Sequence, residues 1–356
     1  MPHTPLRVTL SGYYGFANAG DEAVLAGLAQ SLRALRPADE LAITALSINP
    51  EETRRAHGIE AAHRYKSREL LPALKSTDAL LSGGGSLLQD VTSAHGIFYY
   101  LGVVRVAQML GKKTAFIAQG IGPLVRPRSR KLVAAVANRL DAVTVRDTDS
   151  AELLRAIGVR KPPIEVTADP ALLLSPAHAY EPLKGDSFGV ALRPWQGHDA
   201  LALQVAEACR LPLAECRALL FAMQPESDKL PMEQFGQKWR QINRVVDSPS
   251  GLTSLLPNLG CCQMIVGMRL HALILAAACG VPSAALSYDP KVAAFMAQSG
   301  QSDAVHDLAR DDIAALPALL ARVWGQRTER AAALMAQLPA LRAAASRNAE
   351  VALGLL

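Results

Sequence analysis

The chain has 356 residues, with 37 Lys and Arg against 32 Asp and Glu, for a formal net charge of +5. Half of the residues are hydrophobic, which excludes a disordered chain, and five cysteines over this length exclude a disulfide-rich mini-protein. The basic excess is weak for the length, and it suits nucleic acid, an anionic small molecule or an anionic membrane surface equally well.

The ends and the cysteines of the sequence indicate where the protein works. The N-terminus has no apolar segment after a basic start, so no secretory signal is evident. The longest apolar run, residues 270–279, is shorter than the ~20 residues that a membrane span needs. We therefore expect a cytoplasmic protein. No two cysteines form a C-x-x-C pair, so buried reduced thiols are expected and a metal site is not.

The first half of the chain alternates short β-type runs with helical patterns. Strands are expected at 6–11, 41–47, 78–82, 114–118 and 142–145, and helices at 21–35, 50–57, 97–110, 128–140 and 147–157. Alternation of this kind predicts a parallel sheet with helices on both faces.

The alternation restarts after residues 175–186, an aperiodic stretch that is the best linker candidate. Strands are expected at 188–192, 217–223, 244–246, 264–266 and 283–286, and helices at 200–209, 232–242, 270–279 and 292–297. The chain is therefore predicted to be an α/β protein with two tandem Rossmann-like, doubly wound domains, residues 1–175 and 176–308, facing a ligand-binding cleft. The Ala-rich tail, residues 309–356, is expected to be helical and either to cross back to the first domain or to lie on a membrane surface.

Ligands of doubly wound sheets bind beyond the carboxyl ends of the strands, so functional residues are expected in the loops there. The glycine-rich loop after the first strand carries Asn18 and Asp21, which either line the cleft or serve as turn and cap residues. It lacks G-x-G-x-x-G, so no dinucleotide fingerprint is present. Three glycines that include Gly84 and Gly85 follow the third strand and predict an anion-cradling turn or an ordinary tight turn.

Two arginines follow predicted strands, one in each half of the chain. Arg146 follows residues 142–145, and Arg193 follows residues 188–192. A guanidinium binds a carboxylate or a phosphate in a bidentate fork, so this placement suits a small multiply charged anion. Solvated surface arginines are the alternative.

The segment Gly267-Met268-Arg269-Leu270-His271 carries the sharpest signal. It joins a strand to an almost wholly apolar helix, which must be buried, so the polar pair Arg269 and His271 at its start is not a random solvated face. A helix N-terminus also attracts anions. Lys291 opens the next helix and would add a third cation. A structural histidine is the alternative for His271.

Taken together, the segments GYYGFANAGDEAVL, LLSGGGSLLQDVTS, AQGIGPL, VRD, TADPALLL, GMRLHALILAAACGVP and LSYDPKV resemble the polysaccharide pyruvyl transferases of the CsaB type, over about residues 6–298. The resemblance implies a GT-B-like fold, phosphoenolpyruvate as the donor and a saccharide as the acceptor. It further implies a 4,6-ketal on N-acetylmannosamine of a secondary cell-wall polysaccharide precursor, a modification associated with S-layer anchoring. No cofactor, metal or nucleotide is expected.

The residues and the resemblance lead to a common set of roles. His271 is predicted to be the acid that protonates the donor, or a proton shuttle. The base on the acceptor hydroxyl is predicted to be Asp21 or Asp199. The predicted donor-binding cations are Arg269 and Lys291 for the phosphate, and Arg193 or Arg146 for the carboxylate.

Two other functions remain open at this point. The first is a nucleotide-sugar glycosyltransferase of the GT-B fold, in which the N-terminus of the 270–279 helix would hold a diphosphate. The second is a non-catalytic carbohydrate-binding protein, against which the retained histidine among cations argues. For the pyruvyl transferase we expect a lipid-linked acceptor, peripheral contact at the inner face of the membrane and no nucleic-acid partner.

Overall fold

The computed structural model describes residues 5–91, 94–175, 185–195, 197–239, 242–247 and 251–356, without the side chains of 94–95 and 242–247. Most of the expected linker, 176–184, lies outside these residues. The chain divides into two compact units. The first comprises Met1–Phe16, Asp21–Leu173 and Arg342–Leu356, and the second comprises Ala17–Gly20 and Leu174–Leu341.

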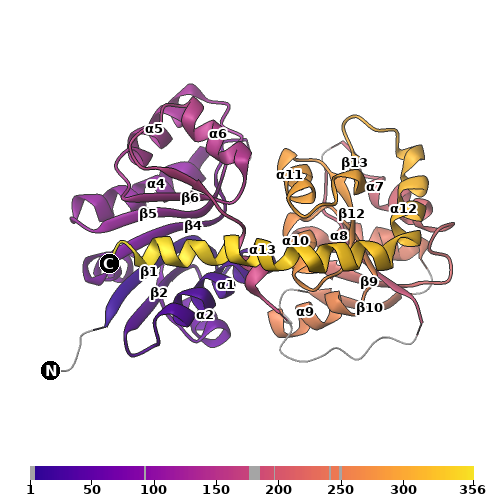
Figure 1. Ribbon diagram of the computed structural model, residues 1–356, viewed down its shortest axis with the longest axis horizontal. Helices are drawn as coiled ribbons and strands as arrows, with labels where there is room; N and C mark the ends of the chain where they lie inside the picture. Colours follow the sequence, from indigo (N-terminus) through magenta and orange to yellow (C-terminus); the bar gives the residue numbers. More distant parts are fainter. Residues whose placement is uncertain (1–4, 92–93, 176–184, 196, 240–241, 248–250) are drawn as a thin grey trace. The chain divides into compact units, whose positions relative to one another are not determined.

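The first unit is built on a seven-stranded parallel sheet in the order β3-β2-β1-β4-β5-β6-β7 (Figure 1). Its strands are β1 (Leu6–Tyr14), β2 (Leu41–Ser47), β3 (Glu60–His63), β4 (Ala79–Leu88), β5 (Lys113–Ile121), β6 (Ala142–Val145) and β7 (Ile164–Val166). Its helices are α1 (Ala19–Leu35), α2 (Pro50–His57), α3 (Ser67–Ser76), α4 (Ala94–Met109), α5 (Pro127–Ala137) and α6 (Thr148–Ala156).

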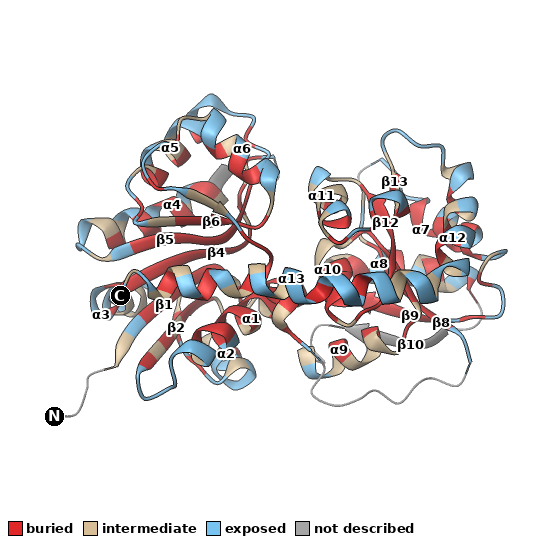
Figure 2. Cartoon of the chain, in the orientation of Figure 1, coloured by how far each residue is buried: buried red, intermediate tan, exposed pale blue. Residues whose placement is uncertain are grey.

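Both faces of this sheet are buried, as the continuous apolar strands require. Neighbouring residues of β4 show it, because Leu80 packs with Phe116 in one apolar layer and Leu81 packs with Ile117 in another. Side chains alternate between the two faces of a strand, so the sheet lies between two layers of helices. Figure 2 shows the strands buried and the outer faces of the helices exposed.

The second unit holds a six-stranded parallel sheet in the order β10-β9-β8-β11-β12-β13. Its strands are β8 (Ser187–Ala191), β9 (Arg217–Ala222), β10 (Ile242–Asp247), β11 (Met264–Gly267), β12 (Ser283–Ser287) and β13 (Val305–Asp307). Its helices are α7 (Leu201–Cys209), α8 (Pro225–Lys238), α9 (Leu252–Gly260), α10 (Leu270–Ala278), α11 (Pro290–Gln298) and α12 (Leu316–Gly325). The predicted α/β class with two doubly wound parallel sheets is confirmed.

The last helix, α13 (Arg327–Leu353), contributes to both units. Its residues up to Leu341 group with the second unit and those from Arg342 group with the first. Within the first unit, Ala349 and Ala352 join the apolar layer formed by β1, β2, β4 and β5.

Two further properties follow from the described residues. No helix in that part of the chain combines the length and the apolar character needed to cross a membrane. All five cysteines are free thiols: Cys209, Cys216 and Cys262 are buried, and Cys261 and Cys279 are half-buried.

Candidate functional site

Three predicted residues lie in the segments that follow neighbouring strands, at the carboxyl edge of the second unit's sheet. Arg193 follows β8, Arg269 follows β11 and Lys291 comes after β12, and these strands are consecutive in the sheet. The Arg193 Nη1 donates to the Tyr288 hydroxyl at 2.8 Å, and its guanidinium lies 4.8 Å from the centroid of that ring. The loops after β8 and β12 therefore meet across the end of β11.

Arg269 is held by a buried carboxylate that the sequence did not indicate. Its Nε donates to the two Asp228 carboxylate oxygens at 3.2 and 3.0 Å, and its Nη2 donates to the Ser227 hydroxyl at 2.7 Å and to Asp228. The Asp228 side chain is fully buried, and that of Arg269 is 13% exposed. Asp228 therefore balances the charge of Arg269 and fixes the turn that precedes α10.

His271 is the second residue of α10, whose N-cap residue, Arg269, supplies no side-chain cap. Its half-buried ring lies against the backbone of Gly20, which belongs to the same unit. A Cβ on Gly20 would come within 2.2 Å of the His271 Nδ1, so only glycine leaves room for this ring position. The Ala19 N–H donates to the Met223 carbonyl at 2.8 Å and holds this short segment in place.

Lys291 lies in the first turn of α11, where Pro290 occupies a starting position and the Asp289 carboxylate accepts from the Lys291 N–H at 3.0 Å. Two helix N-termini, those of α10 and α11, therefore begin at the carboxyl edge that carries Arg193 and His271. Asp199 is exposed on the loop after β8.

Three predicted residues of the first unit, Asp21, Gly84 and Gly85, lie close together around the start of α1. The Asp21 side chain is 7% exposed, and a Cβ on Gly85 would lie 3.0 Å from its Oδ1. Gly84 has a φ of +75°, and a Cβ there would meet Val24 at 2.2 Å. The expected turn at these glycines is wrong, because β4 continues through them to Leu88 and the missing side chains let the strand pass close to α1.

Asn18, the other predicted residue of this loop, is placed in the second unit. Its Oδ1 accepts from the Gly20 N–H at 3.0 Å, at the beginning of α1. This contact gives Asn18 the turn and cap role that was one of its two expected roles.

Arg146 is buried at the carboxyl end of β6 with a side chain only 5% exposed. Its Nη1 donates to Asp169 at 2.8 Å and its Nη2 donates to the Ser86 hydroxyl at 2.8 Å. The backbone of Gly120 packs on the guanidinium, since a Cβ there would lie 3.1 Å from Nε. Asp169 therefore balances the charge of this arginine and fixes its direction.

A model of the polysaccharide pyruvyl transferase family matches residues 18–290, which include most of the residues described above. The chain belongs to this family. Among curated proteins, the transferase is similar to the amylovoran biosynthesis protein AmsJ of Erwinia amylovora, with 22% identity over 85% of this chain and 88% of that protein.

The fold of the transferase is GT-B-like. HepE of Anabaena, solved in complex with UDP and glucose, superposes with a TM-score of 0.60 at 11% identity, covering 98% of this chain and 99% of that one. The UDP-GlcNAc 2-epimerase of Neisseria meningitidis, bound to UDP-GlcNAc, gives 0.58 at 12% identity, covering 96% and 97%. At this identity the likeness concerns the fold alone.

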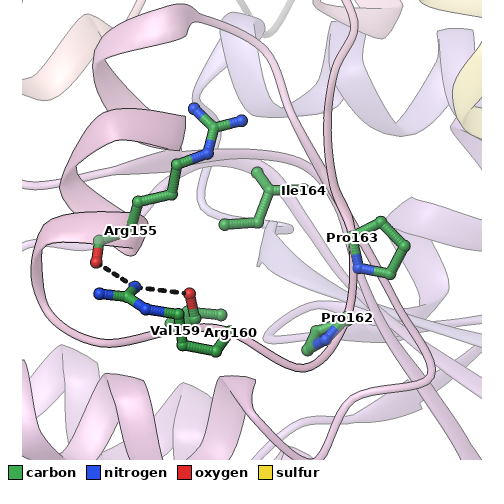
Figure 3. Close-up of a pocket in the computed structure, with 6 residues that line it drawn as sticks. All are labelled: Arg155, Val159, Arg160, Pro162, Pro163 and Ile164. Carbon is green, nitrogen blue, oxygen red and sulfur yellow. Dashed lines mark hydrogen bonds between the residues drawn. The ribbon is translucent and has the colours of Figure 1, made fainter.

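A pocket of about 340 Å³ lies elsewhere in the first unit, lined by Arg155, Val159, Arg160, Pro162, Pro163 and Ile164 (Figure 3). Ile164 is the first residue of β7 and the other five residues come before it, so the pocket lies at the amino edge of the sheet. The Arg160 guanidinium turns back to the carbonyls of Val159 and Arg155. Within the described part of the transferase, no group of three or more His, Cys, Asp or Glu residues could hold a metal ion.

Proposed function

We propose that this transferase moves the pyruvyl group of phosphoenolpyruvate to a saccharide as a ketal and releases phosphate. One observation carries the proposal: Arg193, His271 and Lys291 share the carboxyl edge of one sheet with the N-termini of α10 and α11. A phosphate and a carboxylate on one small molecule match this combination of helix ends and cations.

The phosphate is assigned to the ends of α10 and α11 together with Lys291. Asp228 balances the charge of Arg269, so the main contribution of Arg269 is to hold the turn that precedes His271. Arg193 is assigned to the donor carboxylate, since its guanidinium is half-buried and oriented by Tyr288. Arg146 remains the second predicted residue for the carboxylate, with a direction fixed by Asp169.

The proposed chemistry is an addition followed by a displacement. His271 gives a proton to C3 of the donor while the first sugar oxygen bonds to C2, and the base removes the hydroxyl proton. The second sugar oxygen then bonds to C2 as the C2–O bond to phosphate breaks, and the departing phosphate carries that bonding pair. The proton of the second hydroxyl passes to a base or to the phosphate. No net oxidation or reduction occurs, so the reaction needs no redox cofactor.

Asp21 is the first choice for the base on the acceptor hydroxyl. It is nearly buried beside Gly85, whereas Asp199 is exposed on its loop. A carboxylate held in a partly desolvated place is a better positioned base than one in water.

The proposed acceptor is a lipid-linked saccharide precursor, as the CsaB resemblance implies. The ketal would join the 4- and 6-hydroxyls of its N-acetylmannosamine. Membrane contact and a link to S-layer anchoring belong to the same proposal. A panel of saccharides that differ in the orientation of these hydroxyls, followed by mass spectrometry of the product, tests the acceptor.

The decisive experiment follows phosphate release from phosphoenolpyruvate with the acceptor present. His271→Ala should lower kcat by about 10²–10⁴-fold, as expected for loss of a general acid. Lys291→Ala should raise the KM for phosphoenolpyruvate at least ~10-fold, the effect of losing about 1.4 kcal/mol of binding. Lys229, 77% exposed on α8, supplies the control variant Lys229→Ala, which should match the wild type. Activity of His271→Ala within ~10-fold of wild type would remove the acid role.

The donor separates this function from a nucleotide-sugar glycosyltransferase. A ligand that binds the folded protein raises its midpoint of thermal unfolding. We expect stabilisation by phosphoenolpyruvate that Lys291→Ala weakens. Stabilisation by UDP and not by phosphoenolpyruvate would favour the glycosyltransferase instead.

A further inference from the structure

The first unit contains a buried arginine surrounded by aromatic rings that the proposed chemistry does not use. Arg64 follows β3 and is 2% exposed. Its guanidinium carbon lies 5.1 Å from the ring centroid of Phe16, 4.4 Å from that of Tyr99 and 5.2 Å from those of Tyr65 and Tyr100. Among the described residues it forms no ion pair with a carboxylate, and its Nη1 donates to the Gly12 carbonyl at 2.8 Å. We name these five residues the Arg64 cluster.

One ring of the Arg64 cluster faces solvent. Tyr65 is 58% exposed although it is a large aromatic residue. It makes an edge contact with the Tyr99 ring at 5.1 Å, and its N–H donates to the His63 Nδ1 at 3.2 Å. The Tyr99 hydroxyl donates to the Arg64 carbonyl at 3.0 Å. The Tyr99 ring edge and the Arg64 guanidinium therefore restrict the orientation of the exposed ring.

The Arg64 guanidinium also determines which face of the Tyr65 ring a ligand can reach. A guanidinium over an aromatic face is attracted by the negative face of the ring. Because Arg64 covers one face of Tyr65, the opposite face is the one available to a ligand. Rigid aromatic side chains supply contact area at a low cost in conformational entropy.

The Arg64 cluster lies at the edge of the sheet that carries the proposed base. Phe16 comes two residues after β1 ends, and Tyr65 comes two residues after β3 ends, so both lie at the carboxyl edge. Burial raises the pKa of Tyr100, and the charge of Asp21 adds to that rise. The pKa of Tyr14 is raised in the same way by burial and by Asp21. Asp21 is thus within electrostatic reach of Tyr100, which packs on Arg64.

We propose that the exposed face of Tyr65, backed by Arg64, is a stacking platform for a pyranose ring of the acceptor saccharide. The apolar C–H face of a pyranose packs against an aromatic face, while its hydroxyls stay free for hydrogen bonds. The inference rests on the proposed function for the identity of the ligand as acceptor. It adds the surface that recognises the sugar ring, at the edge where Asp21 would accept the hydroxyl proton.

The test measures saccharide binding without any donor, by saturation-transfer NMR with the methyl glycosides of N-acetylmannosamine and of galactose. Tyr65→Ala should weaken binding at least ~10-fold, since it removes the aromatic face on which the sugar ring packs. Tyr65→Trp should retain binding. Met109, 74% exposed at the end of α4 and next to the amino edge of β5, supplies the control Met109→Ala, which should bind like the wild type.

Kinetics and donor binding separate this inference from the proposed function. In Tyr65→Ala the KM for the acceptor should rise, while the KM for phosphoenolpyruvate and the thermal stabilisation by phosphoenolpyruvate stay unchanged. If Tyr65→Ala loses sugar binding and the wild type does not bind phosphoenolpyruvate, the stacking platform is supported and phosphoenolpyruvate as the donor is wrong. Equal sugar binding by Tyr65→Ala and the wild type, or no binding of either glycoside by the wild type, would overturn the platform.

Discussion

At the residue scale, the position of the His271 ring depends on the absence of a side chain at Gly20. A Cβ at that position would lie 2.2 Å from Nδ1 and 2.5 Å from Cγ of the ring. Gly20→Ala should therefore displace the ring and lower kcat by ~10–10²-fold, the range expected when a catalytic group moves by about 1 Å. Steady-state kinetics with phosphoenolpyruvate and acceptor measure the effect.

Gly102 provides the matched control for this substitution. It also lies in a helix, α4, but a Cβ there would meet nothing within 4 Å. Gly102→Ala should leave kcat unchanged and stabilise the protein by up to about 1 kcal/mol, because alanine favours the helix. Equal kinetics of the Gly20→Ala and Gly102→Ala variants would show that the ring position does not limit the reaction.

The buried carboxylate of Asp228 balances the charge of Arg269 and fixes the position of its side chain. Asp228→Ala would leave the Arg269 charge, 13% exposed, without its partner. Breaking a buried ion pair in this way costs about 3–5 kcal/mol, so urea denaturation should show a loss of that order in the free energy of unfolding. Asp199→Ala, at an exposed position, should change it by less than about 0.5 kcal/mol. A similar small loss for Asp228→Ala would contradict the structural role.

At the element scale, Asp90 fixes the chain between β5 and α5. Its carboxylate accepts from the N–H groups of Val125 and Arg126 at 2.7 and 2.9 Å. Burial works to raise the pKa of Asp90, but these two bonds and one from the Ser129 hydroxyl outweigh burial, so the pKa lies below its usual value. The ionised form therefore stabilises the folded state above the unfolded pKa of about 3.9, and this stabilisation is lost as the pH falls through the lower folded pKa.

Asp90→Asn tests this pH dependence. The variant should be less stable than the wild type by about 1–3 kcal/mol at pH 7, since an amide replaces one of the two accepting oxygens with a donor. The difference should stay constant between about pH 5 and 8 and shrink below about pH 4. Urea denaturation of both proteins across this range gives the comparison, and a difference that does not change with pH would contradict the role of the charge.

The sequence predicted the elements well where local signals mark their ends. Residues 50–57 form α2 as expected, because Asn49 caps the helix, Pro50 starts it and Gly58 ends it in the left-handed region. The predicted start of α8 lies seven residues too late, at Met232, because Pro231 lies inside the helix, where a proline usually ends a helical pattern. The signals at the true start, Pro225 followed by acidic residues in the first turn, are those of a helix N-terminus. Arg269 adds a contact that no local pattern contains, because its side chain bonds to Ser227 and Asp228 in the first turn of this helix.

The candidate site was predictable to a similar extent. A polar pair on an apolar helix marks Arg269 and His271 from the sequence alone. The partners that decide what these residues can do, Asp228 and Gly20, lie 41 positions before Arg269 and at the far end of the chain. Arg64 was missed for the same reason, because its aromatic neighbours come from three separate segments.

At the scale of the whole molecule, one helix, α13, contributes residues to both units. The Asn348 side chain of α13 is fully buried and belongs to the first unit. Its Oδ1 accepts from the hydroxyls of Thr144 and Thr167 at 2.6 and 2.9 Å, and its Nδ2 donates to the Ala168 carbonyl at 2.9 Å. These bonds join the C-terminal part of the chain to β6 and to the residues that follow β7.

Asn348→Ala should therefore destabilise the first unit selectively. It removes the acceptor of the Thr144 hydroxyl and the donor to the Ala168 carbonyl, and each buried group left unsatisfied costs about 1–3 kcal/mol. The Thr167 hydroxyl keeps its bond to the Val145 carbonyl at 3.1 Å. Hydrogen exchange followed by mass spectrometry should show faster exchange in peptides from β6 and β7 and unchanged exchange in β8, β9 and β11. Thr328→Ala, on the exposed surface of the same helix, should leave both sheets unchanged. Faster exchange in both sheets after Asn348→Ala would instead mean that the two units unfold together.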